Sequence, residues 1–584
     1  MSRPRDIARI LGKTEAANPD NKAIKANDGV PGGLSVFDSA GLLPSSGLTG
    51  GQQAYVTGNS RLYITNGTNW FSRAVINATP VLTLSSSGTI ALTPGSATVI
   101  RLTGTDSDNA DANITYSIES GGDLFKFATI AQDSAKQYTI TPRSEDSTVS
   151  LGSDGSATLT FRASDGISVA SAVNTFTLSF GPDWTGSLTE SKLKASDAQA
   201  NDYLGNSVHI GNDGLYAIAG AYGEDAGGSS AGAAYVFLRT GSNWAQQAKL
   251  VASDAQASDY FGYTQGVAIS TNGTHACAGA ILEATGGTYS GAAYIFVRSG
   301  TSWSQQAKLV ASNASAYGKF GNSTSISGDG SYFITGAPGE DTSVTNSGGA
   351  YVFVRSGTSW SQQQILKASD AGENHNFGQS TYMSTDGTYA VVGAHDGDNT
   401  GSNGKAYIFT RSGTTWSQQA KIVASDGSAN DKFGYTVAIN SDGTYAVVGA
   451  PYQDTGGTDT GAAYIYARSG SSWSQQAKIQ SSDVQADDGF GWSVSISGDG
   501  GHVMVGALKE DTTASDAGSA YIFKRSGSSW SQIKKIQATG AASGDKFGGG
   551  VSISSSDGTY AIIGAERESS VASRSGAAYV FKGA

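Results

Sequence analysis

A segment of about 57 residues recurs seven times in the last two-thirds of the chain, and it constrains the fold more than any other feature. Each copy contains a Phe-Gly pair (Leu-Gly in the first copy), with its glycine at Gly205, Gly262, Gly321, Gly378, Gly434, Gly491 and Gly548. A Gly-Ala pair follows in every copy, beginning at Gly220, Gly279, Gly336, Gly393, Gly449, Gly506 and Gly564. A fixed period of this length is typical of repeat architectures, in which each copy forms one structural unit.

Within one copy, apolar residues alternate with polar ones as β-strands require. In residues 432–478, Val437 and Ile439 belong to a first strand, and Tyr445 and Val447 to a second. Asp442-Gly443 lies between them and predicts a tight hairpin in which both residues have positive φ. Two further strands complete the copy, so each copy predicts a four-stranded antiparallel blade, and seven copies predict a seven-bladed propeller.

The two ends of the repeat region predict how the ring closes. The last copy ends near Phe581 and lacks the Trp-to-Lys strand of the other copies. That strand occurs instead before the first copy, in residues 184–193. We expect it to complete the last blade, which leaves no open sheet edge in a propeller domain formed by residues 183–584.

The copies resemble the FG-GAP repeat, the propeller unit of integrin α chains. The shared order is Trp, Lys-Leu-x-Ala-Ser-Asp, Phe-Gly, Asp-Gly, Gly-Ala-Pro and Gly-Ala-Tyr-Val-Phe, from Trp184 onward. Calcium-binding integrin repeats carry an Asp-x-Asp-x-Asp-Gly loop between the first two strands. This chain has only a short turn there, such as Ser441-Asp442-Gly443, so calcium is not expected at that position.

Three regions precede the propeller. Residues 1–33 form a predicted anchor segment, residues 34–76 a small β-hairpin region, and residues 77–182 a predicted β-sandwich, because strand-like runs alternate there with turns. The first 75 residues resemble the N-terminal region of structural proteins from tailed phages of marine bacteria, including cyanophages. Residues 102–118 and 162–178 resemble cadherin-like (Ig-like) repeats. That resemblance implies calcium at Asp106 and Asp108, with Asp165 as a further ligand; the alternative is that these are solvated turn residues.

Composition narrows the range of partners. The net charge of −12 argues against a nucleic-acid surface, which is normally basic. No apolar run is long enough to span a membrane, and the N-terminal apolar stretch is too short for a secretory signal. We therefore expect no nucleic-acid partner, no membrane insertion and no signal peptide.

The long, varied loops of an up-and-down blade all lie on one face, and binding residues on a rigid scaffold usually lie in such loops. Five acids recur there, five positions after the Gly of the Gly-Ala pair: Asp225, Asp341, Asp398, Asp454 and Asp511. They predict either Asx turns or a rim that binds cations or sugars. In the fourth copy a metal site is a further hypothesis, with the ligands His375, His395, Asp396 and Asp398.

Signals of catalysis are weak, since the five histidines are scattered and no serine has a nucleophile-elbow setting. We predict an all-β, non-enzymatic virion protein of a tailed phage, either a tail or head fibre or a decoration protein. Its N-terminus would contact other virion proteins, with a homotrimer as one arrangement, and its propeller would bind a host-surface glycan or protein. The alternatives are a bacterial surface adhesin with an integrin-like propeller and a glycan-cleaving propeller enzyme. No cofactor is predicted apart from the calcium above.

Overall fold

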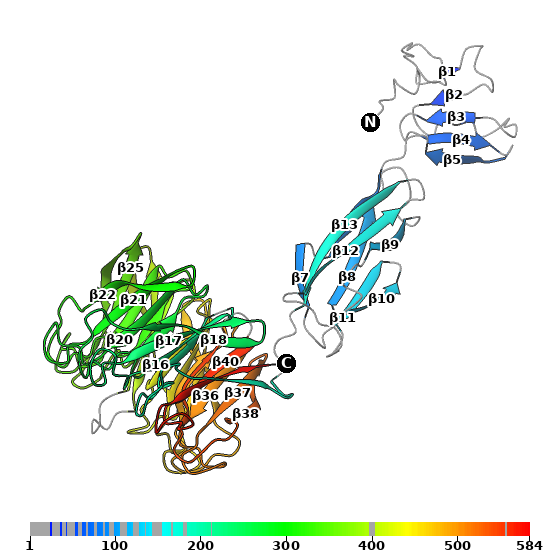
Figure 1. Ribbon diagram of the computed structural model, residues 1–584. Coiled ribbons are helices and arrows are strands. Elements are labelled where there is room, and N and C mark those ends of the chain that lie inside the picture. The colour runs from blue at the N-terminus through cyan, green and yellow to red at the C-terminus, as the bar shows by residue number, and fades with distance from the viewer. Residues whose placement is uncertain are drawn as a thin grey trace. The chain divides into compact units, whose positions relative to one another are not determined.

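The computed structural model describes residues 184–583, except 212, 396–402 and 555–557. In the preceding chain it describes residues 24–25, 35–37, 43, 53–56, 61–65, 68–74, 79–85, 88–92, 98–105, 114–120, 128–134, 136–142, 155–164 and 168–178. All regular elements of these residues are β-strands, and none of them is a helix able to cross a membrane. The chain divides into two compact units, Met1–Phe180 and Gly181–Ala584 (Figure 1).

The first unit begins with one five-stranded sheet in the order β1-β2-β3-β4-β5. Its strands are β1 (Ile24–Lys25), β2 (Ser35–Phe37), β3 (Gln53–Val56), β4 (Arg61–Thr65) and β5 (Trp70–Ala74). Strands β2 and β3 are parallel, and the other neighbours are antiparallel. Among the side chains described in this sheet, Ala54 and Val56 are buried and pack against Leu43, Tyr63 and Trp70.

The rest of the first unit contains two four-stranded sheets, in the orders β10-β11-β8-β6 and β7-β13-β12-β9. Their strands are β6 (Val81–Leu84), β7 (Gly88–Leu92), β8 (Thr98–Thr105), β9 (Thr115–Ser120), β10 (Ala128–Ser134), β11 (Gln137–Pro142), β12 (Gly155–Ser164) and β13 (Val169–Leu178). Ile100 and Tyr138 of the first sheet share one hydrophobic core with Leu159 and Phe161 of the second. The predicted β-sandwich is therefore present as two sheets with a common core, and its likeness to cadherin repeats stays a prediction.

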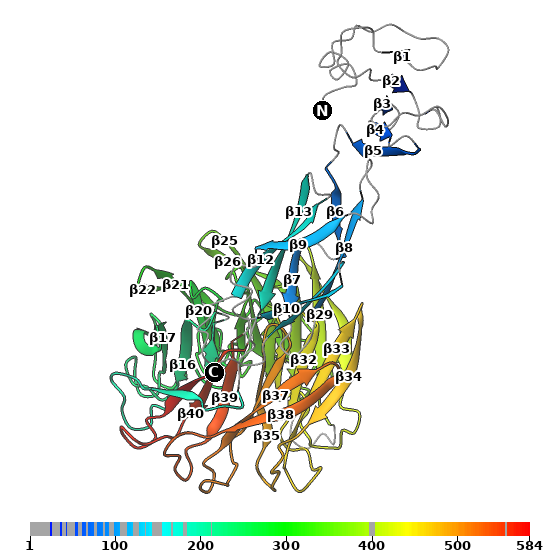
Figure 2. The same ribbon diagram turned by 90° about the vertical axis from the view of Figure 1, so that its right-hand side faces the viewer.

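The second unit is the seven-bladed propeller (Figures 1 and 2). Blade 1 contains β15 (Val208–Ile210), β16 (Tyr216–Ala221), β17 (Ala233–Thr240) and β18 (Asn243–Leu250), and blade 2 contains β19 (Val267–Ile269), β20 (His275–Ala280), β21 (Ala292–Ser299) and β22 (Ser302–Leu309). Blade 3 contains β23 (Thr324–Ile326), β24 (Tyr332–Ala337), β25 (Gly349–Ser356) and β26 (Ser359–Leu366), and blade 4 contains β27 (Ser380–Met383), β28 (Tyr389–Ala394), β29 (Lys405–Ser412) and β30 (Thr415–Ile422). Blade 5 contains β31 (Thr436–Ile439), β32 (Tyr445–Ala450), β33 (Ala462–Ser469) and β34 (Ser472–Ile479), and blade 6 contains β35 (Phe490–Ile496), β36 (His502–Ala507), β37 (Ser519–Ser526) and β38 (Ser529–Ile536). Blade 7 contains β39 (Phe547–Ile553), β40 (Tyr560–Ala565), β41 (Ala577–Lys582) and β14 (Thr189–Leu193).

Blade 7 combines strands from the two ends of the propeller. Strand β14 pairs antiparallel with β41, with Leu193 opposite Ala578 and Thr189 opposite Lys582. The side chain of Trp184 is fully buried, and its Nε1 donates a hydrogen bond to the carbonyl of Gly558 at 3.1 Å. The pairing covers the edge of β41 and joins the first residues of the domain to the last.

The hairpin between the first two strands of each blade differs from its prediction in one respect. In blade 5, Gly443 has a φ of 67°, whereas Asp442 is not among the residues with positive φ. The loop spans five residues, 440–444, because β31 ends at Ile439 and β32 begins at Tyr445. The carboxylate of Asp442 accepts a hydrogen bond from the backbone N–H of Thr444 at 3.0 Å. The prediction of positive φ at both residues was therefore wrong, because a loop of this length needs only one left-handed residue, after a type I turn.

The two conserved glycine positions of the repeat meet across every blade boundary. In each blade, a Cβ added to the glycine of the Gly-Ala pair would collide with the carbonyl oxygen of the Phe-Gly glycine in the next blade. Gly449 of blade 5 faces Gly491 of blade 6 in this way, and Gly564 of blade 7 faces Gly205 next to blade 1. The backbones of neighbouring blades approach so closely that only glycine fits.

A partly exposed polar network also links successive blades. The hydroxyl of Tyr464 in blade 5 donates to Asp426 at 2.9 Å, and Lys478 donates to the other oxygen of the same carboxylate at 2.6 Å. Asp426 belongs to the Ala-Ser-Asp segment that leaves blade 4, so the contact fastens one blade to the next. The other blades with this aspartate repeat the tyrosine contact in the pairs Tyr235–Asp197, Tyr294–Asp254, Tyr407–Asp370 and Tyr521–Asp483. In blade 3, Tyr351 donates instead to the neutral Asn313 at 3.0 Å.

Candidate functional site

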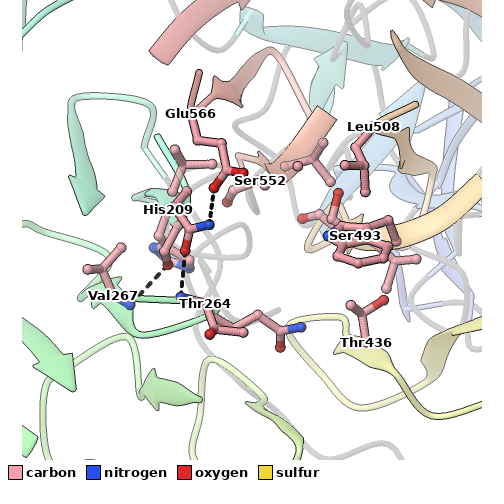
Figure 3. Close-up of a pocket in the computed structure, with 18 of the residues that line it drawn as sticks. His209, Thr264, Val267, Thr436, Ser493, Leu508, Ser552 and Glu566 are labelled. Atoms are coloured by element: carbon pink, nitrogen blue, oxygen red, sulfur yellow. Dashed lines mark hydrogen bonds between the residues drawn. The ribbon is translucent and has the colours of Figure 1, made fainter. Parts of the chain in front are cut away.

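A cavity of about 440 Å³ lies at the centre of the ring, and residues of all seven blades line it. Figure 3 shows residues of blades 1 and 2 facing residues of blades 5 and 6 across an open space; the labelled ones are His209, Thr264, Val267, Thr436, Ser493 and Leu508. The volume falls in the range of ~300–1,000 Å³ that is usual for small-ligand sites. The cavity is lined by residues of the first strands of the blades and of the long loops. These loops lie on the face of the propeller that was predicted to bind.

Two large side chains close the inner end of the cavity. His209 of blade 1 and Tyr382 of blade 4 line both this cavity and a second space of only about 20 Å³. His209 Nδ1 accepts a hydrogen bond from the N–H of Ile269 at 3.3 Å, and Nε2 lies 3.4 Å from the Tyr382 hydroxyl. The corresponding residues of the other blades are small: Ala268, Ser325, Ala438, Ser495 and Ser552. These two residues therefore lie between the cavity and the smaller space.

Burial keeps this closing pair neutral. It lowers the pKa of His209 to about 4 and raises the pKa of Tyr382 to about 12. Because Nδ1 accepts a backbone hydrogen bond, the proton of the neutral imidazole is on Nε2, which can donate it to the Tyr382 hydroxyl. The inner end of the cavity is therefore uncharged at neutral pH.

Aromatic side chains line the cavity on opposite sides of the ring. On one side, the rings of Tyr222 and Tyr263 have centroids 4.7 Å apart, edge to face. On the other, the rings of Tyr435 and Trp492 have centroids 4.8 Å apart. Burial raises the pKa of Tyr222 and of Tyr435, so both hydroxyls stay protonated. These walls offer apolar ring faces beside polar groups.

The charged groups of the cavity lie mainly in blades 6 and 7. Among the described lining residues, the cations are Lys509, Lys546 and Arg567, and the carboxylate is Glu566. Lys546 forms an ion pair with Asp516 at 3.1 Å, and Arg567 lies 3.6 Å from Glu566. Glu566 also accepts a hydrogen bond from Asn206 (Figure 3). The cations of this edge contrast with the net charge of −12 of the whole chain, so the local potential at the cavity differs in sign from the overall charge.

An insertion in blade 2 shapes the cavity further. Four residues lie between Gly262 and Val267, whereas two lie between Gly434 and Val437 in blade 5. The insertion leaves Thr264 with a φ of 57°, which is rare for a β-branched residue. Gln265 of the insertion accepts a hydrogen bond from the Ser380 hydroxyl of blade 4 at 2.5 Å. Strained residues of this kind cluster at binding sites, where the surrounding structure holds them in place.

The loop acids predicted on this face support their own loops. Asp225, Asp341, Asp454 and Asp511 are exposed, and each accepts a hydrogen bond from the backbone N–H five residues later. The donors, Ser230, Asn346, Asp459 and Asp516, all have positive φ. None of these four acids lines the cavity. Asp398 lies outside the described residues. At the four described positions these carboxylates therefore stabilise their own loops, through a contact that reaches further along the chain than the predicted Asx turn, and a ligand-binding role for them stays a prediction.

The predicted metal ligands lie only partly within the described residues. Asp106, Asp108, Asp165, Asp396 and Asp398 are outside them. His375 Nδ1 accepts a hydrogen bond from the backbone N–H of Gly372, and the His395 ring lies 5.8 Å from that of Tyr435. Within the described residues, no group of three or more His, Cys, Asp or Glu side chains could hold a metal ion.

The cavity residues were not predicted from the sequence, although the sequence contains a signal for them. The residue after the Phe-Gly pair differs from copy to copy: Asn206, Tyr263, Asn322, Gln379, Tyr435, Trp492 and Gly549. The second residue after the Gly-Ala pair also differs: Gly223, Leu282, Gly339, Asp396, Tyr452, Lys509 and Arg567. Five residues of the first set line the cavity, as do Lys509 and Arg567 of the second, so copies that share one strand pattern differ at positions that surround the cavity.

The fold and this site define the class of protein: a seven-bladed β-propeller with an aromatic, partly cationic cavity on its axis. Seven segments match the FG-GAP repeat family, namely residues 188–237, 244–296, 303–353, 360–409, 416–466, 473–523 and 530–581. These matches cover more than half of the chain, which therefore belongs to the FG-GAP repeat family. Each match begins in the outer strand of one blade and ends in the third strand of the next, so every sequence repeat spans a blade boundary.

No curated protein matches the chain. Among solved structures, the chain is similar to the WD40 repeats of RRP9, with a TM-score of 0.42 and 10% identity over 69% of this chain and 98% of that one. It is also similar to Sqt1 from Chaetomium thermophilum, with a TM-score of 0.38 and 13% identity over 65% of this chain and 83% of that one.

Proposed function

We propose that this protein is an appendage of a tailed-phage particle, a tail or head fibre or decoration protein, that displays its propeller for attachment to the host surface. The family and the fold support the coarser role of a surface-binding propeller. The observation that carries the binding role is the central cavity: seven blades with the same strand pattern form the ring, and residues of all seven line the cavity with side chains that differ from blade to blade. Varied side chains on a regular scaffold are typical of binding sites.

The virion role is supported by the N-terminal region. Its first 75 residues resemble those of phage structural proteins, and the β region of residues 34–76 is too short to bury much apolar surface by itself. Docking on other virion proteins, or assembly of three copies, would bury further surface there. In this proposal the protein acts by binding and performs no catalysis.

Mass spectrometry of purified particles tests this function. We expect peptides of the chain in particles purified by density gradient, and gold-labelled antibodies against the propeller at the surface of intact particles. Recombinant protein added before infection should compete for attachment sites and slow the adsorption of the particles. Particles that lack the chain would refute the proposal, and new reducing ends released from host polysaccharide would refute its non-enzymatic part.

A further inference from the structure

We propose that the central cavity binds an acidic sugar, a pyranose ring that bears a carboxylate, within a host-surface polysaccharide. The inference rests on the proposed function and adds to it the site and the chemical class of the ligand. Three features of the cavity carry it: the aromatic walls, the polar groups between them, and the cations of blades 6 and 7.

The aromatic walls suit the apolar face of a pyranose. A sugar ring presents C–H groups on its faces and hydroxyls around its edge, so it packs against an aromatic ring while its edge remains available for hydrogen bonds. Tyr435 and Trp492 lie on one side of the cavity, and Tyr222 and Tyr263 on the other. The two rings of each pair contact each other and so hold each other in place, which limits the conformational entropy that these side chains lose when a ligand binds.

Polar groups between the walls match the edge of a sugar. Thr436 and Ser493 belong to the same blades as Tyr435 and Trp492, and Gln265 is held in place by its hydrogen bond with Ser380. The hydroxyls of Thr436 and Ser493 already donate to the carbonyls of Gly491 and Gly548, which leaves their oxygen atoms as acceptors for a sugar hydroxyl, and the amide nitrogen of Gln265 is a donor. The neutral pair of His209 and Tyr382 closes the cavity behind them, so the ligand must enter from the loop face.

The cations select an acidic sugar over a neutral one. Lys509 and Arg567 occupy the same position of the repeat in neighbouring blades, and both are exposed at the edge of the cavity. Lys546 also lines the cavity but pairs with Asp516 at 3.1 Å, and Glu566 is the one carboxylate among the described lining residues. A carboxylate on a ring packed against Trp492 would reach this edge, where charge-assisted hydrogen bonds are stronger than neutral ones.

A glycine of blade 7 can be replaced by a large side chain that would fill the cavity, and this substitution removes no existing side-chain contact. Gly549 lines the cavity at the position that Trp492 occupies in blade 6. Its φ is not positive, and an added Cβ would meet only the Lys546 carbonyl oxygen, at 3.3 Å. The substitution Gly549→Trp should therefore fold and block the site. The matched control is Gln379→Trp, which places the same side chain at the same repeat position in blade 4, outside the cavity.

Calorimetric titration of the full chain with glucuronic acid, glucose and inorganic phosphate tests the inference. We expect glucuronic acid to bind about tenfold more tightly than glucose, the discrimination that one charge-assisted hydrogen bond supplies, and phosphate to bind no more tightly than glucose. Gly549→Trp should abolish glucuronic acid binding, and Gln379→Trp should retain it. Lys509→Gln should lower the preference for the acid, whereas Lys524→Gln, an exposed lysine of the same blade outside the cavity, should not.

Glucuronic acid binding that survives in Gly549→Trp would overturn the assignment of the site. Equal binding of glucuronic acid and glucose would overturn the preference for an acid, and equally tight phosphate binding would overturn the sugar. Absence of binding to either sugar would overturn the inference as a whole. If the protein still adsorbs to host cells in that case, the proposed function stands. Sugar binding by a chain that is missing from the particles would refute only the proposed function.

Discussion

Substitution of Gly449 by alanine isolates the glycine contact between blades. An added Cβ would lie 2.6 Å from Thr436 Oγ1 and 3.1 Å from the carbonyl carbon of Gly491, and closer still to its oxygen. The φ of Gly449 is not positive, so the backbone conformation itself tolerates alanine. The carbonyl belongs to the backbone of blade 6 and cannot rotate away, so blades 5 and 6 must separate by roughly 1 Å, which forfeits up to about half of the dispersion energy of the contacts involved.

Overpacking of this kind costs about 1–3 kcal/mol, and the rigid neighbour places Gly449→Ala at the upper end, about 3 kcal/mol. With an m-value of about 3 kcal/mol/M, the urea midpoint would fall by about 1 M. Urea unfolding followed by tryptophan fluorescence measures this shift. Gly549→Ala is the control, because its Cβ meets no atom closer than 3.3 Å, and its free energy of unfolding should stay within about 0.5 kcal/mol of that of the parent protein. Equal midpoints for the parent and Gly449→Ala would refute the claim that this glycine pair sets the spacing of the blades.

Three further outcomes follow from the structure. A chain that begins at residue 195 lacks β14 and leaves β41 as a free edge, so it should aggregate in light scattering, whereas a chain that begins at residue 182 should stay monodisperse. Burial raises the pKa of Asp488 to about 6, so the folded state binds more protons than the unfolded state and loses stability as the pH rises from about 4 to 6. The variant Asp488→Asn lacks this titration, so its urea midpoint relative to that of the parent protein should rise over the same pH window. A difference between the two midpoints that does not change with pH would contradict this reasoning. Tyr464→Phe removes a hydrogen bond to a carboxylate and should lower the free energy of unfolding in urea by about 1.5–3 kcal/mol. Tyr351→Phe removes a hydrogen bond to a neutral amide and should lower it by about 0.5–1.5 kcal/mol. Equal losses in the two variants would argue against the ionic character of the first contact.

The ring could be predicted from the sequence because its signals are local and repeated. Alternating residues such as Val437 and Ile439 predict strands, and seven copies at a nearly constant period predict seven blades. The strand in residues 184–193 could be recognised because it has the pattern that the last copy lacks, and the structure pairs Thr189–Leu193 with Ala578–Lys582. The details of single turns were less predictable: Asp442-Gly443 predicted two positive φ values, and the length of the loop allowed one.

The sequence by itself determined the strands, the number of blades and the family, since each of these depends on a pattern that is complete within one repeat. Only the tertiary structure decided where the site is. Closure of the ring brings Asn206, Tyr435 and Glu566, which are more than a hundred residues apart in the chain, to one cavity, and it leaves exposed acids such as Asp454 to stabilise their own loops. A side chain acquires a binding role from its neighbours in space, and in a closed ring those neighbours come from every blade.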